Sequence, residues 1–558
     1  MGTFQHILKA HYEKHPEQVA IYLQHAGQED IPISYRSLLN HSAATQHKLE
    51  QEGIQPGEVV LLILQHGQDL IYSYFGTILH GAIPSIMPYL TEKLQPERYR
   101  QDLASLIQVS QPAAIITYDE FEPEVKAALT QDSSVRSVLL ADQVPHGVEP
   151  IFDLKRRLPE DIVLLQHSSG TTGLQKGVAL SHQAVLKHIS SYASALHIAE
   201  DDLVVSWLPL YHDMGLIAGF LMPILYNIPL VLMSPFDWVR APYRLMQSVS
   251  QYKGTLVWLP NFAYNFCAQK IRARHMEGVD LSSWRAVINC SEPMRHESQQ
   301  VFLEAFQPYG FRASAIATSY AMAENTFAVT QGGIDEPVTI DPVDRESLQV
   351  DRIARPAMEG RHLINMVSAG KPIAGTRVKV INPEGQILED RHIGEIALLS
   401  NYMLTEYYHR PNTTQKAFLD GWYLTGDFGY MLNGEVYITG RKKDLIIIGG
   451  KNIYPQDLER IAMTVPGVHP GRTVAFGIFS KRIGTEQVVI VAEVDPSNED
   501  EKQRIANEIR QAVTQGSAVA LRHVHLVEEN WIIKTSSGKT ARLANREKFI
   551  KETGYSTD

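Results

Sequence analysis

The stretch QHSSGTTGLQKGVALSH, at 166–182, contains the residue types of this chain that are best suited to chemistry. It follows an apolar run at 162–165, which predicts a short buried strand. Glycine lets the backbone approach a ligand closely and point successive N–H groups into one concavity. The hydroxyl donors and the positive charge of the run are Ser168, Ser169, Thr171, Thr172 and Lys176. The stretch therefore predicts a loop that binds a polyphosphate.

The spacing of its glycines differs from two common phosphate-binding patterns. In the P-loop pattern GxxxxGK[ST], four residues separate the two glycines, whereas only two residues separate Gly170 from Gly173. A dinucleotide-binding loop needs GxGxxG at the start of a helix, which this run does not provide. A flexible surface loop without a ligand has a similar composition. The interpretation therefore depends on partner residues elsewhere in the chain.

Alternating helices and apolar strands would position this loop. The first 55 residues are predicted to be mostly helical, with helices over 3–15 and 34–53 joined by a polar turn. Beyond them, helical periodicity alternates with short apolar runs, which is typical of βαβ units with a largely parallel sheet and helices on both faces. The predicted strands are 58–64, 81–88, 113–118, 132–140, 162–165, 203–208, 229–233 and 255–259. We therefore predict an α/β fold.

The pattern changes in the last part of the chain. Residues 335–367 are predicted to be an irregular loop, and a new α+β pattern follows GRKKD at 440–444. The short strands predicted between them are 378–381, 394–399 and 435–438. A chain of 558 residues is also too long for one core. We predict a large N-terminal domain, 1–440, with parallel-type sheets flanked by helices plus a β-rich subdomain, and a small mobile α+β C-terminal domain, 441–558.

Composition argues against several classes of protein. The formal net charge of −11 does not favour nucleic acid as the main partner. Cys267 and Cys290 cannot form a disulfide framework, and the N-terminal residues lack a signal-peptide pattern, so we expect a cytoplasmic location. Residues 215–233 are the nearest approach to a membrane span, but they contain Asn227 and two prolines. We expect a buried core segment there, and no stable membrane insertion.

Further stretches with chemically useful residues are spaced along the chain. They are PLYHDMG (209–215), NCSEPM (289–294), SYAMAEN (319–325), YLTGDFGY (423–430), GRKKD (440–444) and KTSSGKTAR (534–542). Each residue alone has an ordinary explanation, such as a packed tyrosine, a helix-capping carboxylate or a basic surface. Together, and in this order, they resemble the motifs of the adenylate-forming enzymes, the superfamily of acyl/aryl-CoA synthetases, luciferases and peptide-synthetase adenylation domains. A fixed order of several motifs is far more specific than any single pattern.

This resemblance implies a site for ATP and Mg²⁺. The implied nucleotide-binding residues are Ser168, Ser169, Gly170, Thr171, Thr172, Gly173, Lys176, Ser291, Glu292, Pro293, Tyr320, Ala321, Met322, Asp427 and Arg441. Among them, Tyr320 would stack on adenine, and Asp427 would accept hydrogen bonds from the ribose hydroxyls. Glu324 would hold Mg²⁺ together with Thr171.

The resemblance also implies the reaction. A substrate carboxylate attacks the α-phosphate of ATP and pyrophosphate leaves, so two anions must meet among positive charges and N–H donors. A carboxylate is already ionised at neutral pH, so no general base is needed. The implied catalytic residues are Lys539, which can bridge the carboxylate and the α-phosphate, and His212, beside the reacting carboxylate. Lys443 occupies the hinge position about which the C-terminal domain would swing.

Three features resemble one subgroup, the fatty acyl-AMP ligases that load acyl carrier proteins. They are LPLYHDMGLI, the element NIYPQDLE at 452–459, and the 46 positions from Glu324 to Gly370, an interval that is shorter in typical acyl-CoA synthetases. The excess falls in 335–367, where this subgroup carries an insertion that restrains the C-terminal domain and disfavours CoA. This resemblance implies transfer of the acyl group to the phosphopantetheine arm of an acyl carrier protein in polyketide- or lipopeptide-type biosynthesis.

Other substrates and acceptors remain open from the sequence. A fatty acyl-CoA ligase has the same first half-reaction and uses free CoA. An amino-acid adenylating enzyme would use Asp213 to bind the substrate amine. A degenerate homologue would act as a binding or scaffold protein, although retention of Lys539, Glu324, Asp427 and Arg441 argues against it.

The acyl pocket and two departures from the family pattern complete the predicted site. Apolar residues flanking His212 are the expected pocket, although periodicity alone would place them in the core: Met214, Ile217, Trp258, Phe262 and Ala263. Ala321 stands where the family has the glycine of YGxTE or YGxAE, which affects the expected α-phosphate contacts. Cys290 stands where a glycine is common.

Overall fold

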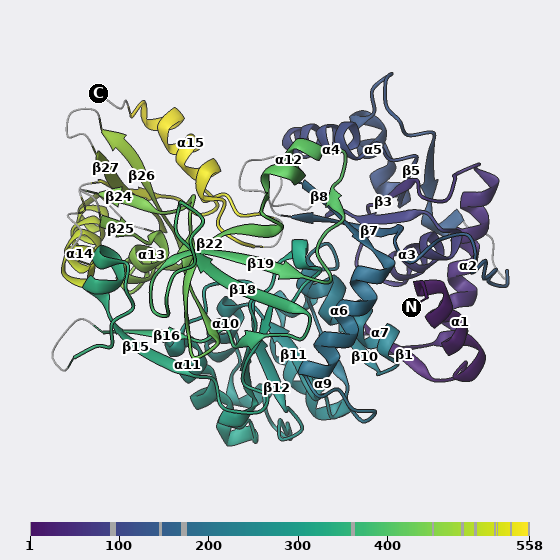
Figure 1. Ribbon diagram of the computed structural model, residues 1–558, viewed down its shortest axis with the longest axis horizontal. Helices are drawn as coiled ribbons and strands as arrows, with labels where there is room; N and C mark the ends of the chain where they lie inside the picture. The colour runs from purple at the N-terminus through teal and green to yellow at the C-terminus, as the bar shows by residue number, and fades with distance from the viewer. Residues whose placement is uncertain are drawn as a thin grey trace.

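The computed structural model describes residues 2–89, 96–143, 148–168, 176–358, 363–448, 451–480, 485–495, 499–517, 521, 523–535 and 538–555. Figure 1 shows the N-terminal helices at one end of the long axis and the C-terminal helices and strands at the other. The two largest sheets of the described residues are mostly parallel and lie in the N-terminal part. The predicted α/β fold is confirmed.

One of these sheets contains the strands on either side of the predicted phosphate loop. Its parallel strands are short apolar runs, such as the fully buried VVLL of β3, because both faces of the sheet are covered. β7 and β8 pair antiparallel with Ser168 opposite Lys176, so the loop connects two neighbouring strands. In spatial order the strands are β20 (Glu406–Tyr407), β8 (Lys176–Ser181), β7 (Ile162–Ser168), β4 (Ile83–Ile86), β3 (Val59–Leu62), β5 (Ala114–Thr117) and β6 (Ser137–Leu140).

The second sheet is parallel except for its edge pair, β1 and β2. In spatial order its strands are β13 (Ile316–Thr318), β12 (Ala286–Asn289), β11 (Leu256–Leu259), β9 (Val204–Ser206), β10 (Leu230–Met233), β1 (Val19–Gln24) and β2 (Ile31–Ser34). Helices lie against the two sheets (Figure 1): α1 (Phe4–Lys14), α2 (Tyr35–Gln51), α3 (Gln68–His80), α4 (Pro96–Ser110), α5 (Glu122–Ala128), α6 (His182–Ala195), α7 (Met222–Tyr226), α8 (Pro235–Arg240), α9 (Tyr243–Tyr252), α10 (Asn261–Lys270) and α11 (His296–Phe306).

The prediction for the first 55 residues is only partly correct. The two predicted helices are α1 and α2, and Ser34 caps α2 by accepting a hydrogen bond from Ser37 N–H. The segment between them is not a polar turn, because it forms the antiparallel pair β1–β2. β1 also pairs parallel with β10, about 200 residues further along the chain. Local composition does not reveal a partner at that distance.

Residues 335–367 are also more regular than predicted. β15 (Ile340–Asp344) and β16 (Leu363–Val367) form an antiparallel pair, and a π-helical turn, Ser347–Asp351, follows β15. The buried Asp341 carboxylate anchors this hairpin to the β-rich region. It accepts hydrogen bonds from Arg391 at 3.1 and 3.2 Å and from the Tyr430 hydroxyl at 2.7 Å. The segment therefore packs through a buried polar contact that its own irregular sequence does not indicate.

The remaining strands form a β-rich region and a C-terminal α+β unit. In the β-rich region they are β14 (Thr330–Gln331), β17 (Lys371–Pro372), β18 (Thr376–Ile381), β19 (Gly394–Ser400), β21 (Phe418–Leu419), β22 (Trp422–Leu432) and β23 (Glu435–Arg441), with helix α12 (Pro411–Lys416). The C-terminal elements are β24 (Ile446–Ile448), β25 (Lys451–Ile453), α13 (Pro455–Met463), β26 (Val468–Ser480), β27 (Thr485–Val494), α14 (Glu499–Ser517), β28 (His523–Val527) and α15 (Arg542–Thr553).

The hydrophobic clusters follow the same division. Two clusters draw all their buried members from Ile446 onward, whereas the main cluster runs from Phe4 to Val436. The domain boundary at 440/441 stays a prediction. Residues 215–233 are a buried core segment, as expected, formed by a π-helix (Met214–Leu221), α7 and β10. Within the described part of the chain, every helix is too short or too polar to cross a bilayer.

Replacement of Arg391 by alanine should destabilise the fold by about 2 kcal/mol, because hydrogen bonds to a buried carboxylate are lost. Urea unfolding measures this change. The matched control is Arg355→Ala, since Arg355 pairs with Asp351 on the surface of the same segment. An exposed pair of this kind contributes about 0–1 kcal/mol. Equal effects of the two substitutions would contradict the anchoring role of Asp341.

Candidate active site

Parallel strands place their carboxyl ends at one edge of a sheet, and the predicted residues of the second sheet follow those ends. His212 follows β9, Phe262 follows β11, Ser291 follows β12 and Tyr320 follows β13. These strands lie side by side in the order β13, β12, β11 and β9. Open α/β sheets bind ligands outside the carboxyl ends of their strands. The register of the sheet therefore brings four distant segments to one edge.

A chain of polar contacts joins this edge to the β-rich region. The Tyr320 hydroxyl donates to Asp427 Oδ2 at 2.7 Å, and Arg441 Nε lies 3.4 Å from Asp427 Oδ1. Asp427 and Arg441 face each other in the β22–β23 ladder, so strand register makes the ion pair. Burial, with the neighbouring Asp427 carboxylate, raises the pKa of Tyr320, and the hydroxyl therefore stays a donor. This group has the donors and acceptors needed to bind a ribose diol.

The NCSEPM loop after β12 combines an unusual backbone with a buried carboxylate. Ser291 has a φ of +70°, which is rare for residues other than glycine. Residues that adopt such a conformation are often found at functional sites. Glu292 accepts a hydrogen bond from Phe262 N–H at 2.9 Å, and burial raises the pKa of Glu292. Pro293 is exposed. Burial raises the pKa of the Cys290 thiol to about 12, so this residue stays protonated.

The segment after β13 folds back on itself. Ala321 forms an antiparallel bridge with Ala328, and Met322 N–H donates to the Phe327 carbonyl at 2.9 Å. Ala321 is not among the described residues with positive φ. An alanine therefore fits here, in place of the family's glycine, without backbone strain.

Glu324 belongs to a second polar group, which includes the phosphate-loop lysine. The Tyr407 hydroxyl donates to Glu324 Oε1 at 2.8 Å and lies 2.9 Å from the Tyr423 hydroxyl. Lys176 Nζ lies over the Tyr407 ring, 4.6 Å from its centroid. The structure thus brings the predicted metal ligand and the predicted phosphate-binding lysine to the same tyrosine.

The centre of the predicted phosphate loop lies outside the described residues, which omit Ser169, Gly170, Thr171, Thr172 and Gly173. Its two ends are placed. Ser168 ends β7 and Lys176 begins β8, opposite each other in the ladder. β7 also packs against the turn Ala323–Asn325, which carries Glu324.

His212 is paired with its neighbour in the sequence. His212 Nδ1 lies 2.7 Å from Asp213 Oδ1, and Met214 N–H donates to the same oxygen at 2.9 Å. Burial alone would raise the pKa of Asp213, but His212 and Lys539 together hold it below its usual range. Asp213 also accepts the first N–H of the π-helix that continues into the core, which fixes the orientation of the pair.

Lys539 of the C-terminal part lies against this group of charges. Burial, followed by the Arg441 guanidinium, lowers the pKa of Lys539, while Asp213 and Glu292 oppose that shift. These charges belong to three separate motifs, PLYHDMG, NCSEPM and GRKKD. The Lys443 side chain is exposed, and partial desolvation together with Arg441 lowers its pKa.

A tight turn presents Lys539. Lys534 and Thr540 form an antiparallel bridge, Thr535 N–H donates to the Lys539 carbonyl at 2.7 Å, and Lys539 N–H donates to Thr535 Oγ1 at 3.1 Å. Behind the turn, Arg542 bonds Glu459 at 2.6 Å and Asp444 at 2.8 Å. This clamp ties the turn to α13 and to the segment that follows Lys443.

The expected acyl-pocket residues lie close to the nucleotide loops. Met214, Ile217, Trp258 and Ala263 are buried in the main core, whereas Phe262 is 41% exposed. The Ser291 hydroxyl lies 3.6 Å from Met214 Sδ, and Trp258 Nε1 donates to the Tyr192 hydroxyl at 2.8 Å. Their role in holding an acyl chain stays a prediction.

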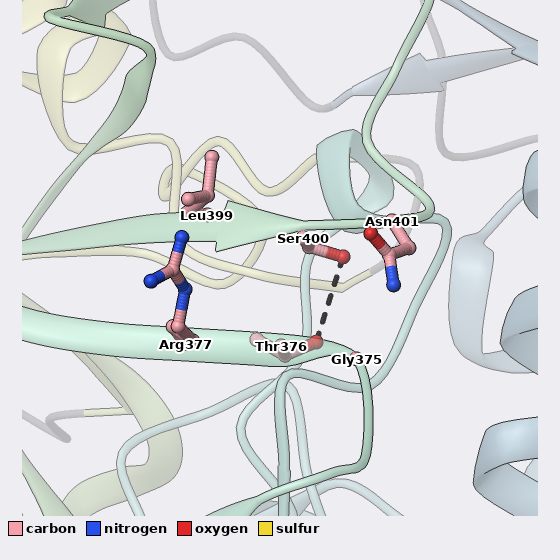
Figure 2. A pocket seen from close by; sticks show the side chains of 6 residues that line it. All are labelled: Gly375, Thr376, Arg377, Leu399, Ser400 and Asn401. Carbon is pink, nitrogen blue, oxygen red and sulfur yellow. Dashed lines mark hydrogen bonds between the residues drawn. The ribbon is translucent and has the colours of Figure 1, made fainter.

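The cavities of the described residues differ in their relation to the site. An open pocket of about 340 Å³ lies at the start of β18 and the end of β19, and its lining contains none of the predicted site residues. Figure 2 shows the side chains that line it. Thr376 and Ser400, at its floor, lie 3.5 Å apart. A narrower apolar cavity of about 20 Å³ reaches Pro209, Leu210 and Tyr211, directly before His212.

The profile of one enzyme family, described as AMP-binding enzyme, matches residues 8–408. The chain belongs to this family. The predicted adenylate-forming superfamily is therefore confirmed.

Similar proteins carry related descriptions. The medium-chain-fatty-acid–[acyl-carrier-protein] ligase JamA of Moorena producens is 31% identical over 98% of this chain and 94% of its own length. A putative acyl-CoA synthetase of Caulobacter vibrioides is 28% identical over 93% of this chain and 91% of its length. A solved structure from a study of fatty acyl-adenylate ligases of E. coli and L. pneumophila is 27% identical, with a TM-score of 0.92 over 100% of this chain and 99% of that one. The resemblance to fatty acyl-AMP ligases is confirmed.

The motifs do not identify every polar residue of this AMP-binding enzyme's site. Tyr407 lies outside the motifs, in TEYYHR at 405–410, and no spacing in the sequence marks it. Asp213 is inside a motif, but its contact with His212 and its nearness to the charge of Lys539 appear only in the structure. These contacts depend on the pairing of β20 with β8 and on the placement of the C-terminal part.

Asp427→Asn should weaken AMP binding by roughly tenfold or more, since a hydrogen bond to a charged acceptor contributes about 1.5–3 kcal/mol. Isothermal titration calorimetry measures the affinity. Asp202→Asn is the matched control, because Asp202 pairs with Arg285 at 2.7 Å at the amino ends of β9 and β12. That pair lies at the opposite edge of the sheet. Unchanged AMP affinity of Asp427→Asn would contradict the placement of the ribose.

Proposed function

We propose that this enzyme activates a fatty acid by joining its carboxylate to the α-phosphate of ATP, with release of pyrophosphate. The phosphopantetheine thiol of an acyl carrier protein then attacks the acyl carbonyl of the acyl-AMP, so that a thioester forms and AMP leaves. The observation that carries this proposal is the position of Lys539 among the charges of Asp213, Glu292 and Arg441. The descriptions of JamA and of the fatty acyl-adenylate ligases support the substrate and the acceptor.

The charges around Lys539 suit the meeting of two anions. Burial, followed by the Arg441 guanidinium, lowers the pKa of Lys539, so the two positive charges lie near each other. Such fixed cations stabilise charge that crowds together in the transition state. Asp213 contacts His212 at 2.7 Å, and the charge of Lys539 helps to lower its pKa, so neighbouring groups offset its repulsion of an incoming carboxylate. The pairing also leaves Asp213 poorly suited to bind a substrate amine, which favours a fatty acid over an amino acid.

The site residues fit a magnesium ion that arrives with ATP. The described residues contain no group of three or more His, Cys, Asp or Glu that could form a metal cage. Mg²⁺ typically uses one or two carboxylates together with phosphates and water. Glu324 would hold it together with Thr171, and bound Mg²⁺ neutralises the pyrophosphate leaving group.

The remaining roles in this proposal follow the two parts of the chain. Residues 1–440 would bind ATP and the acyl chain, and 441–558 would act as a lid that delivers Lys539. Lys443 would be the hinge, and His212 would lie beside the reacting carboxylate. The nucleotide would contact Ser168, Ser169, Gly170, Thr171, Thr172, Gly173, Lys176, Ser291, Glu292, Pro293, Tyr320, Ala321, Met322, Asp427 and Arg441.

Contacts of residues 335–367 support a carrier protein over free CoA as the acceptor. The Arg345 guanidinium donates to the Gly516 carbonyl at the end of α14. On the same side, Arg295 of the N-terminal part pairs with Asp457 of α13 at 3.0 Å. These contacts would restrain the rotation that exposes the site to CoA. The alternative is a CoA-dependent ligase, in keeping with the description of the Caulobacter relative.

Lys539→Ala should reduce acyl-AMP formation by about 100-fold or more, the usual effect of removing a charge-stabilising group. Mass spectrometry of the acyl-AMP formed from ATP, Mg²⁺ and fatty acid measures the rate. Lys551→Ala, an exposed lysine in the last turn of α15, is the control and should keep full activity. A wild-type rate of acyl-AMP formation by Lys539→Ala would contradict the catalytic role assigned to this lysine.

Arg345→Ala should leave acyl-AMP formation intact and raise acyl-CoA formation several-fold, because the C-terminal part loses one restraint. The assay offers free CoA in one tube and a phosphopantetheinylated carrier protein in the other. Arg355→Ala, which removes a pair inside the same segment, should not change the acceptor. Efficient acyl-CoA formation by the wild type would replace the carrier-protein proposal with the CoA-dependent alternative.

A further inference from the structure

Tyr407 contacts two predicted charged groups of the site, although it belongs to none of the motifs. Its side chain is buried, with 3% of its surface exposed. Its hydroxyl donates to Glu324 Oε1 at 2.8 Å, and its ring lies under Lys176 Nζ at 4.6 Å from the centroid. One side chain therefore contacts both the predicted metal ligand and the predicted phosphate-binding cation.

Backbone hydrogen bonds hold the tyrosine between these partners. Thr405 N–H donates to the Ala179 carbonyl and Tyr408 N–H to the Gly177 carbonyl, both at 2.8 Å, which ties β20 to the strand that begins at Lys176. On the other side, Leu404 N–H donates to the Glu324 carbonyl at 2.7 Å. Backbone hydrogen bonds therefore tie the segment 404–408 both to Glu324 and to the strand that begins at Lys176.

The two ends of the side chain have the chemistry that these partners require. The hydroxyl donates a hydrogen bond to Glu324 Oε1, which leaves the other carboxylate oxygen of Glu324 without this partner. The face of an aromatic ring attracts an ammonium group and leaves its N–H donors able to bind an anion. A phenylalanine would fill the same space and hold Lys176, but it would leave Glu324 without this donor.

We propose that Tyr407 is a positioning residue that orients Glu324 toward the magnesium ion of MgATP and holds Lys176 for the polyphosphate. This inference rests on the proposed function, in which Glu324 holds the metal. The hydroxyl and the ring then have separable roles. Loss of the hydroxyl weakens the contribution of the metal to ATP binding, and loss of the ring weakens ATP binding even without a metal.

The experiment compares ATP affinity in Mn²⁺ with ATP affinity in EDTA, by calorimetry and without fatty acid, so that no reaction occurs. Mn²⁺ should raise the affinity of the wild type for ATP, and in Tyr407→Phe this gain should be smaller by about tenfold or more. That is the usual cost of losing a group that orients a metal ligand. The affinity of Tyr407→Phe in EDTA should stay close to that of the wild type. Tyr407→Leu should weaken binding under both conditions.

Tyr430→Phe is the matched control. The Tyr430 hydroxyl of β22, in the β-rich region, is also buried and donates to a carboxylate, Asp341 Oδ2, at 2.7 Å. This variant should lose comparable stability and keep the wild-type gain with Mn²⁺. Electron paramagnetic resonance of the bound Mn²⁺ gives a second readout, since its spectrum should change in Tyr407→Phe and not in Tyr430→Phe.

Folding defects do not prevent the test. The hydroxyls of Tyr407 and Tyr423 lie 2.9 Å apart, so Tyr407→Phe removes a partner from Tyr423. The double variant Tyr407→Phe/Tyr423→Phe removes both hydroxyls, and loss of both partners costs less than leaving one unpaired. A wild-type gain with Mn²⁺ in a folded Tyr407→Phe or double variant overturns the inference. Absence of acyl-AMP formation by the wild type overturns the proposed function instead, and the ATP-binding comparison still decides the role of Tyr407.

Discussion

Parallel strands place all their carboxyl ends at one edge of a sheet, and the candidate site depends on this constraint. Segments that are far apart in the chain meet because β9, β11, β12 and β13 run in the same direction in one sheet. Hydrophobic burial on both faces holds these mainly apolar strands. The predicted site residues therefore follow the strands instead of lying within them.

The edge of the sheet supplies only part of the site. Asp427 and Arg441 come from the β-rich region, where the β22–β23 ladder sets them opposite each other, and Tyr320 connects them to the sheet. Lys539 comes from the C-terminal part and reaches the same charges. A site shared in this way changes when its parts move relative to one another, so one set of residues can serve more than one step.

The sequence was sufficient for the overall class and for the enzyme family. Strands such as β3, β5 and β10 were predictable because buried parallel strands are short apolar runs between helices. It failed at the hairpin β1–β2 and at the hairpin formed by β15 and β16. Their stability comes from distant partners: β10 for β1, and Arg391 and Tyr430 for Asp341 of β15. Periodicity reports local preference and contains no information on such partners.

The sequence by itself determined the types and order of the chemical groups: hydroxyls, glycines and lysine in the loop, and carboxylates and basic residues in the later motifs. Only the tertiary structure decided which of them touch. His212 with Asp213, Tyr320 with Asp427, and Tyr407 with both Glu324 and Lys176 are pairings that strand register and packing create. The physical reason is that hydrogen bonds and ion pairs act over a few ångströms in space, whereas the chain specifies only the order of its residues.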